Sequence, residues 1–509
     1  MKNLEKESKK RLSEEEIRDD TLIKYFCKLL KNKQVKYLED MAPFDIYDKS
    51  IEELQDKKKY KDITSEKLIK ILKDLLIEGK ERGDKARVLK LKKIIFQKLW
   101  PYFVRYAIQF LRIKDKRDLG SLKFDLGVKN LMNYFKEFSK FEELLYGIDE
   151  YYRDHSLHVF RVYFLGDYLT QKYLKGYDNI SILNKPNDAQ GDQIIIEESE
   201  KEAIWCIIAL CHDLGYPLQK LDELNQRLVK ILSYYGTSNY NPLRYGLPFE
   251  GIVLDKFILK LISSRITDDY KIHLQSKFFT KYSNAYEKLS HGIMSCILLM
   301  KNLIFFKETD YESHFSEGFY FKDDIHKKEE LFNEDIKQFL IRREILRSIA
   351  SHDNDDIYHI TMNNFIFLLI ICDEIQEWSR PSSNRRVLYP LDEKNKEIIK
   401  ILSFNNEKVD ISIELNLLKT DLEKYVKNKF QKFIKLLRSA VHSYKRAFDF
   451  KILIKNKDNI EYLFEYDNPY NFYKEKESLN EQYKKPRVEK RNPDGTVDPS
   501  FTLKSIIEF

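Results

Sequence analysis

The most constraining feature of this chain is an apolar run over residues 203–211 that ends at an adjacent histidine and aspartate, His212 and Asp213. The run has the length of a helix, and Gly215 and Pro217 follow it as helix-stop residues. A carboxylate and an imidazole in apolar surroundings need a partner, because burying either group unpaired is costly, and a divalent metal ion satisfies both. A capped helix end explains the same residues, so the pair alone does not choose between a metal site and a cap.

Composition indicates a folded, helix-rich protein. The chain has 509 residues, enough for two or three domains, and 43% of them are hydrophobic and 14% aromatic. It contains 15 glycines and 12 prolines, a scarcity that favours long helices over a turn-rich β fold. The net charge of +7 is a small difference between 89 basic and 82 acidic residues. This excess is too small to indicate nucleic-acid binding and fits a small anionic substrate equally well.

The cysteines and the hydropathy pattern bear on the compartment. The scattered cysteines are Cys27, Cys206, Cys211, Cys296 and Cys372. Their odd number and the lack of a C-x-x-C pair argue against a disulfide framework, and we expect buried structural thiols in a reducing compartment. The N-terminal residues lack the apolar core of a signal peptide, and the apolar runs are shorter than the roughly 18 residues that cross a bilayer. We therefore expect a cytoplasmic protein with no membrane segment.

Periodicity along the chain predicts a mainly α fold in four parts. Apolar residues at helical spacing indicate a helical N-terminal extension over residues 1–140 and a helical core over 141–385. Strand-like alternation on either side of an amphipathic helix indicates a small α+β module over 386–468. Residues 469–509 are expected to form a flexible tail, and their basic residues lack the aromatic ladder of a nucleic-acid arm. The α+β module could mediate homo-oligomerisation or bind an effector.

Several further polar residues interrupt apolar helical runs or end them. They are His155 or His158, His291, His352 and Asp373. A single residue of this kind is usually a core residue whose polar atoms are hydrogen-bonded. So many of them in one helical region are hard to explain in that way, because each unpaired buried polar group costs free energy. Imidazoles and carboxylates together suit Mn, Mg, Fe, Zn, Co or Ni. We therefore expect one or two divalent ions.

The order H…HD…D over residues 145–380 resembles the HD superfamily of metal-dependent phosphohydrolases. The stretch His212-Asp213-Leu-Gly is similar to the "HDLG" motif common there. For the first ligand, His155-Ser-Leu-x-Val resembles the helix of deoxynucleotide triphosphohydrolases, whereas His158-x-x-Arg-Val fits the general first-helix pattern. Helices that cross closely need a small residue eight positions on, which favours His158, because Gly166 holds that place for it.

The resemblance implies an HD/PDEase-like helical core and roles for the singled-out residues. His158, His212, Asp213 and Asp373 would bind one metal ion, and His291 and His352 would add ligands where a second ion is present. Asp213 bridges the ions in dinuclear members. His291, with Ser295 one turn later, also resembles the catalytic histidine of mononuclear triphosphohydrolases, which would protonate the leaving oxygen. In either case a metal-activated water would attack phosphorus.

Four cations lie near these motifs in the sequence and could clamp phosphates by charge-assisted hydrogen bonds. They are Arg161, Lys220, Arg244 and Arg380. A cation on an exposed helix face explains each of them as well.

The sequence departs from two familiar patterns of the superfamily. Tyr216-Pro217 follows the His-Asp pair where standard deoxynucleotide triphosphohydrolases have a "GHPPF" run, and the H-x-x-x-G-Y-P signature of cyclic-di-GMP phosphodiesterases is absent. The expected function is that of a metal-dependent phosphohydrolase acting on a small-molecule nucleotide, with a (d)NTP favoured. The alternatives are an HD-type cyclic- or dinucleotide phosphodiesterase, a di-iron HD oxygenase and a nucleotide-sensing regulatory module.

Overall fold

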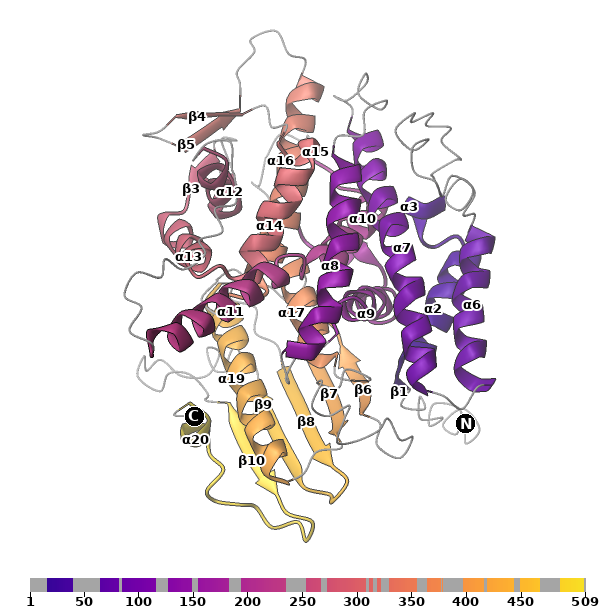
Figure 1. Ribbon diagram of the computed structural model, residues 1–509, viewed down its shortest axis with the longest axis vertical. Coiled ribbons are helices and arrows are strands. Elements are labelled where there is room, and N and C mark those ends of the chain that lie inside the picture. Colours follow the sequence, from indigo (N-terminus) through magenta and orange to yellow (C-terminus); the bar gives the residue numbers. More distant parts are fainter. Residues whose placement is uncertain are drawn as a thin grey trace, which may run out of the picture.

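The computed structural model (Figure 1) shows a mostly helical chain that also forms two β-sheets within its described residues. The mainly α character predicted from the scarcity of Gly and Pro is confirmed at this level. The structure describes residues 16–39, 65–81, 85–115, 127–148, 154–182, 194–234, 253–266, 272–307, 311–314, 318–321, 329–354, 364–376, 378, 397–415, 419–443, 449–466 and 486–507.

Helix α10 (Glu198–Cys211) lies in the middle of the helical part (Figure 1). Its residues from Ala203 onward are apolar on every side, and all of them are buried. A helix of this kind is stable only when other elements surround it. Those elements include α7 (Lys85–Lys114), α9 (His158–Tyr173), α16 (Glu329–Ser351) and α17 (Phe365–Ile375). The end of α10 therefore delivers His212 into the protein interior.

Helices α9 and α10 approach each other closely at a glycine. A Cβ added to Gly166 would lie 2.0 Å from the ring of Trp205, so the contact requires the absence of a side chain. The indole Nε1 of Trp205 also donates to the carbonyl of Tyr163 at 3.1 Å. His158 lies eight residues before Gly166, just over two helical turns, and so comes alongside the end of α10.

The N-terminal helices pack directly on this core. They are α2 (Asp19–Lys31), α3 (Lys36–Glu39), α6 (Ser65–Glu81), α7 and α8 (Val128–Ile148). The indole of Trp100 donates to the carbonyl of Leu210 at 2.8 Å, and the backbone N–H of Lys36 donates to Glu202 at 2.7 Å. The predicted boundary at residue 140 falls inside α8, because the helical pattern continues through it, so the extension and the core meet within one helix.

The C-terminal module confirms the predicted α+β pattern. Strands β7 (Lys408–Leu415) and β8 (Asp449–Asn456) are parallel and are joined by α19 (Lys419–Ser443), and β9 (Glu461–Tyr466) pairs antiparallel with β8. A strand not foreseen, β6 (Ile398–Phe404), pairs with β7. Helix α19 covers one face of the sheet (Figure 1), where Phe430 and Phe433 pack against Phe464 and Phe450.

The prediction of a flexible tail over 469–509 is wrong for residues 486–507. Strand β10 (Arg487–Arg491) pairs with β9, and α20 (Leu503–Ile507) follows it. The basic residue Lys490 is buried in ion pairs with Glu423 and Asp498, both at 2.9 Å, and Phe501 packs near Phe430. At the other edge, β1 (Glu16–Ile17) pairs with β6 and completes the order β1-β6-β7-β8-β9-β10.

The remaining elements lie between α10 and α17 in the chain, apart from the short helix η1 (Tyr177–Asn179). The helices are α11 (Tyr216–Ser233), α12 (Val253–Ser263), α13 (Ser276–Glu287), α14 (His291–Asn302) and α15 (Ile304–Lys307). A small sheet has the order β2 (Ser264–Ile266), β3 (Ile272–Leu274), β5 (Gly318–Phe321), β4 (Tyr311–His314). Among the described helices, none combines the length and hydropathy needed to cross a membrane. All five cysteines are buried and free of disulfides, as expected.

Candidate metal centre

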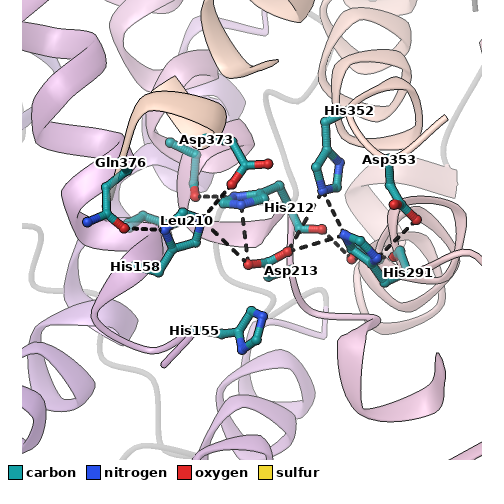
Figure 2. A network of polar contacts seen from close by, with 12 residues as sticks. His155, His158, Leu210, His212, Asp213, His291, His352, Asp353, Asp373 and Gln376 are labelled. Atoms are coloured by element: carbon teal, nitrogen blue, oxygen red, sulfur yellow. Dashed lines mark hydrogen bonds and ion pairs between the residues drawn. The ribbon is translucent and has the colours of Figure 1, made fainter. Parts of the chain in front are cut away.

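Side chains from five helices converge on one buried cluster (Figure 2). His158 begins α9 and His291 begins α14, while His212-Asp213 and His352 directly follow α10 and α16. Asp373 lies near the end of α17. Residues far apart in the sequence thus meet at the ends of helices, which is how helical proteins build polar sites inside an apolar interior.

The four imidazoles of the cluster are held in the same way. In each one Nδ1 lies within hydrogen-bond distance of an oxygen acceptor, which orients the ring so that Nε2 faces the cluster. The pairs are His158 with Gln376 Oε1 at 2.6 Å, His212 with Ala209 O at 2.8 Å, His291 with Gln219 Oε1 at 2.8 Å, and His352 with Ile349 O at 2.6 Å. This arrangement is typical of metal-ligating histidines, whose other nitrogen is usually hydrogen-bonded.

Asp213 lies at the centre of the cluster, and its two carboxylate oxygens face different histidines (Figure 2). Its Oδ2 is 3.4 Å from Nε2 of His212 and 3.9 Å from Nε2 of His158. Its Oδ1 is 3.5 Å from Nε2 of His291 and 3.8 Å from Nε2 of His352. The carboxylate is therefore placed between two sets of nitrogen donors.

Two groups of side chains in the cluster have the spacing of metal ligands. One consists of His158, His212 and Asp373, and the other of His212, Asp213 and His352. Within each group the ligand atoms all lie within 4.8 Å of one another. Nitrogen and carboxylate donors in this mixture suit the borderline divalent metals.

His212 belongs to both groups and is the least satisfied residue of the cluster. Its Nε2 is buried and has no hydrogen-bond partner among the described residues. Burial lowers the pKa of His212 to about 4, despite the opposing charge of Asp213, so the ring is neutral near neutral pH. A neutral imidazole with a buried, unpartnered lone pair is in the state in which histidine binds a metal ion.

Both carboxylates of the cluster are held ionised. Burial opposes the charge of Asp213, but the neighbouring imidazoles, His212 first, outweigh it and hold the pKa of Asp213 well below its usual range. Burial likewise opposes the charge of Asp373, and its hydrogen bond with His158, with 2.8 Å between Oδ1 and Nε2, holds its pKa well below the usual range. Ionised carboxylates at this depth require positive charge nearby.

The facing Nε2 atoms of His291 and His352 also need a cation between them. Their Nε2 atoms are 3.0 Å apart, and two lone pairs at that distance repel unless a proton or a metal ion lies between them. Burial opposes protonation of His352, but the neighbouring carboxylate of Asp213 outweighs burial and raises the pKa of His352 to about 9. A proton thus binds where a metal ion would bind.

Asp353 is a site residue that the sequence reasoning missed. Its Oδ2 is 3.0 Å from Nδ1 of His291 and accepts a hydrogen bond from Ser290 Oγ at 2.7 Å. Burial opposes its charge, but His291 outweighs it and lowers the pKa of Asp353 to about 2. Asp353 therefore orients His291. The signal that could have found it is the second His-Asp dipeptide, His352-Asp353.

The two candidate first ligands occupy different places. His158 lies against Asp373, whereas His155 is outside both ligand groups and stacks on Tyr216, with ring centroids 3.8 Å apart. The backbone N–H of His155 donates to Glu142 at 2.6 Å. Its ring nevertheless acts electrostatically on Asp213, and it lies beneath Asp213 in Figure 2. This geometry favours His158 as the ligand and leaves His155 as a buried neighbour of Asp213.

The four predicted phosphate-binding cations have different surroundings, or lie outside the described residues. Arg161 is buried and bound to Asp19 of α2, with Nε and one terminal nitrogen 2.8 and 3.0 Å from its two oxygens. Arg161 therefore links α9 to α2. Lys220 forms an ion pair with Glu223 at 2.8 Å and follows Gln219, the partner of His291, so it stays near the cluster. Arg244 and Arg380 lie outside the described residues.

Ser295 links the two helix ends that carry His212 and His291. Its hydroxyl lies 2.6 Å from the carbonyl of His212 and 2.8 Å from that of His291, and it accepts from the N–H of Gly215 at 2.7 Å. A Cβ on Gly215 would lie 2.3 Å from the carbonyl of His291, so no larger residue fits. The Gly of the "HDLG" stretch therefore permits the close contact that brings Asp213 beside His291.

No family model, curated protein or solved structure matches this chain. The resemblance to the HD superfamily accordingly stays a prediction, and the interpretation of the site depends on its geometry.

Proposed function

We propose that the cluster binds divalent metal ions and that the protein is an HD-type metal-dependent phosphohydrolase acting on a nucleotide, with a (d)NTP favoured. The observation that carries the proposal is Nε2 of His212, which is buried and unpartnered among the described residues and belongs to both ligand groups. Histidines anchored through Nδ1 and ionised carboxylates surround this atom. A purely structural cluster would be expected to satisfy it.

We further propose two ions with Asp213 as the bridge. Its Oδ2 faces His158 and His212, and its Oδ1 faces His291 and His352. Carboxylates that bridge metal pairs offer one oxygen to each side, as in two-metal phosphatases and nucleases. Asp373 adds a ligand on the first side.

Bound divalent ions would lower the pKa of a water and neutralise charge on phosphoryl oxygens. The chain's own residues would supply orientation and protons. Asp353 and Gln219 hold Nδ1 of His291, which keeps its Nε2 directed toward the cluster. If His291 is not a ligand, its paired imidazole is suited to donate a proton to a leaving oxygen. His155, which acts on Asp213, and Lys220, which follows Gln219 in the chain, could contact the phosphate chain.

Metal analysis combined with a nucleotide panel tests the proposal. Protein purified without chelators should contain up to two divalent ions per chain and should release phosphate, pyrophosphate or triphosphate from some member of a (d)NTP, cyclic-nucleotide and dinucleotide panel with Mn²⁺. The matched control is His273→Ala, an exposed histidine on β3 away from the cluster. Metal-loaded protein that turns over no nucleotide would contradict the proposed reaction, and nucleotide binding without turnover would favour a sensing module.

A second candidate is a di-iron oxygenase, because four histidines around one bridging carboxylate also suit a pair of iron ions. That alternative predicts two irons per chain after aerobic purification and O₂ consumption with a substrate. Zinc or manganese as the resident metal would exclude it.

A further inference from the structure

The C-terminal module contacts the metal-ligand helix through a buried carboxylate. Glu374 in α17 directly follows Asp373, and both of its oxygens bind lysines of α19. Lys429 Nζ lies 2.6 Å from Oε2 of Glu374 and 2.5 Å from its backbone carbonyl. Lys432 Nζ lies 2.5 Å from Oε1. The module is thereby attached one residue away from a candidate ligand.

The two lysines differ in how exposed their ammonium groups are. The side chain of Lys429 is 11% exposed and is bound to two oxygens, so it neutralises and anchors Glu374. The side chain of Lys432 is 57% exposed, although Glu374 is buried. Both lysines thus share one carboxylate, and Lys432 is the one whose ammonium group is exposed.

Lys432 lies beside the cluster, because its partner Glu374 directly follows Asp373. The charge of Glu374 first, and those of Asp373 and Asp353 as well, raise the pKa of Lys432 above the usual range. Asp373 is engaged with His158 and Asp353 with His291, so each already has a partner inside the cluster. The ammonium group of Lys432 is therefore available to a further anion at the edge of the site.

We propose that Lys432 binds the anionic phosphate chain of the substrate, so that the C-terminal module completes the site. This inference rests on the proposed function, because it assumes a phosphorylated substrate at the metal cluster. A lysine ammonium binds phosphate as a mobile point charge, and the flexible stem of an exposed lysine lets it move from Glu374 to the ligand. Arg161 cannot serve in this way while both of its arms bind Asp19.

Tripolyphosphate binding to the Mn²⁺-loaded full-length protein, measured by titration calorimetry, tests the inference. We expect Lys432→Ala to weaken tripolyphosphate binding about tenfold to a hundredfold, the range typical of a hydrogen bond to a charged group. Lys432→Arg should restore most of the affinity. Lys424→Ala, an exposed lysine two turns earlier on α19, is the matched control and should bind as the wild type does. Mn²⁺ affinity should be unchanged in Lys432→Ala, and its thermal midpoint should fall less than that of Lys429→Met, because Lys432 is exposed and Lys429 still binds Glu374.

Two results would overturn the inference: unchanged tripolyphosphate affinity in Lys432→Ala, or no tripolyphosphate binding to the metal-loaded wild type. Lys429→Met provides a contrast, since it should lower the thermal midpoint by leaving one oxygen of buried Glu374 without its lysine. The nucleotide panel separates the two proposals. If Lys432→Ala loses tripolyphosphate while the wild type hydrolyses no nucleotide, the proposed reaction fails and the role of Lys432 in anion binding stands.

Discussion

Two helices of this protein are each followed by a His-Asp dipeptide, and the aspartates of the two dipeptides make different contacts. His212-Asp213 follows α10 and His352-Asp353 follows α16. In both, Nδ1 of the histidine is hydrogen-bonded to the carbonyl oxygen three residues earlier, at 2.8 Å for His212 and 2.6 Å for His352. Each imidazole is therefore oriented by its own helix end and presents Nε2 to the common centre.

The aspartates of the two pairs diverge. Asp213 is 6% exposed and faces four imidazoles, whereas Asp353 is 28% exposed and contacts Nδ1 of His291 and the hydroxyl of Ser290. One carboxylate lies within a group of side chains that could hold a metal ion, and the other contacts the far side of His291. In both dipeptides the helix end fixes the orientation of the imidazole. Packing against other helices determines what the aspartate contacts.

Asp213→Asn should have the largest effect and is the strongest test of this difference. Asparagine keeps the shape but removes the charge that two ions would share, so we expect metal content to fall and kcat/KM to drop by at least about a thousandfold, since a metal ion supplies several kcal/mol of charge stabilisation. Metal analysis and steady-state kinetics on the best nucleotide measure both. Full metal content and activity in Asp213→Asn would remove Asp213 from the centre of the site.

Asp167 in α9 shows what happens to a buried aspartate without imidazole partners. Burial raises its pKa from an ordinary value of 3.8 to about 7, although Tyr177 donates a hydrogen bond to it. Because the folded pKa exceeds the unfolded one, its contribution to stability is complete below about pH 4 and is lost as pH rises through about 7, up to roughly 4 kcal/mol. Asp167→Asn should therefore gain stability relative to the wild type across this range.

The contribution of Asp353 to stability should depend on pH with the opposite sign. Its folded pKa is lowered to about 2, so its contribution is present above about pH 4 and is lost as pH falls through about 2. Thermal midpoints of the metal-free wild type, Asp167→Asn and Asp353→Asn, measured from pH 2 to 8, compare the two, because Asp353 titrates below pH 4 and Asp167 above it. Parallel curves for Asp167→Asn and the wild type would show that Asp167 does not titrate in this window.

Asp353→Asn should affect catalysis less than Asp213→Asn. Loss of a carboxylate that orients a ligand histidine typically costs about tenfold to a hundredfold in metal affinity or activity. Ser290→Ala, which removes the hydroxyl that donates to Asp353, should cost less and serves as the graded control. An Asp353→Asn effect as large as that of Asp213→Asn would make Asp353 a ligand and erase the difference between the pairs.

Much of this site could be predicted because its ligands stand out against apolar helices. His212, Asp213 and Asp373 end or interrupt runs that are otherwise buried, and the helical periodicity around them is strong. Asp353 was missed although it belongs to a second His-Asp dipeptide, because the residues after it are polar and give it no contrast. The two glutamines were missed because a single glutamine carries no local signal for a role beside a histidine. Gln219 reaches His291 across 72 residues and Gln376 reaches His158 across 218, so only tertiary packing reveals these contacts.

The same reason explains the errors in the fold. Strands β1 and β10 join the C-terminal sheet from opposite ends of the chain, and neither carries a strong alternation of its own. Their pairing depends on partners far away in sequence, namely β6 and β9. The internal strands β7, β8 and β9 were predicted because alternation and a crossover helix are local features.

The smallest effect is expected at Gln219, and it tests why His291 needs two acceptors. Nδ1 of His291 lies 2.8 Å from Gln219 and 3.0 Å from Asp353, so Gln219→Ala leaves the carboxylate in place. Gln376 is buried and accepts from Nδ1 of His158, for which the described residues offer no second acceptor within hydrogen-bond distance. Gln219→Ala should therefore lower kcat/KM by about threefold or less, while Gln376→Ala should lower it about tenfold or more. Equal losses in the two variants would mean that Asp353 does not orient His291, and the second His-Asp pair would then have to act through His352 alone.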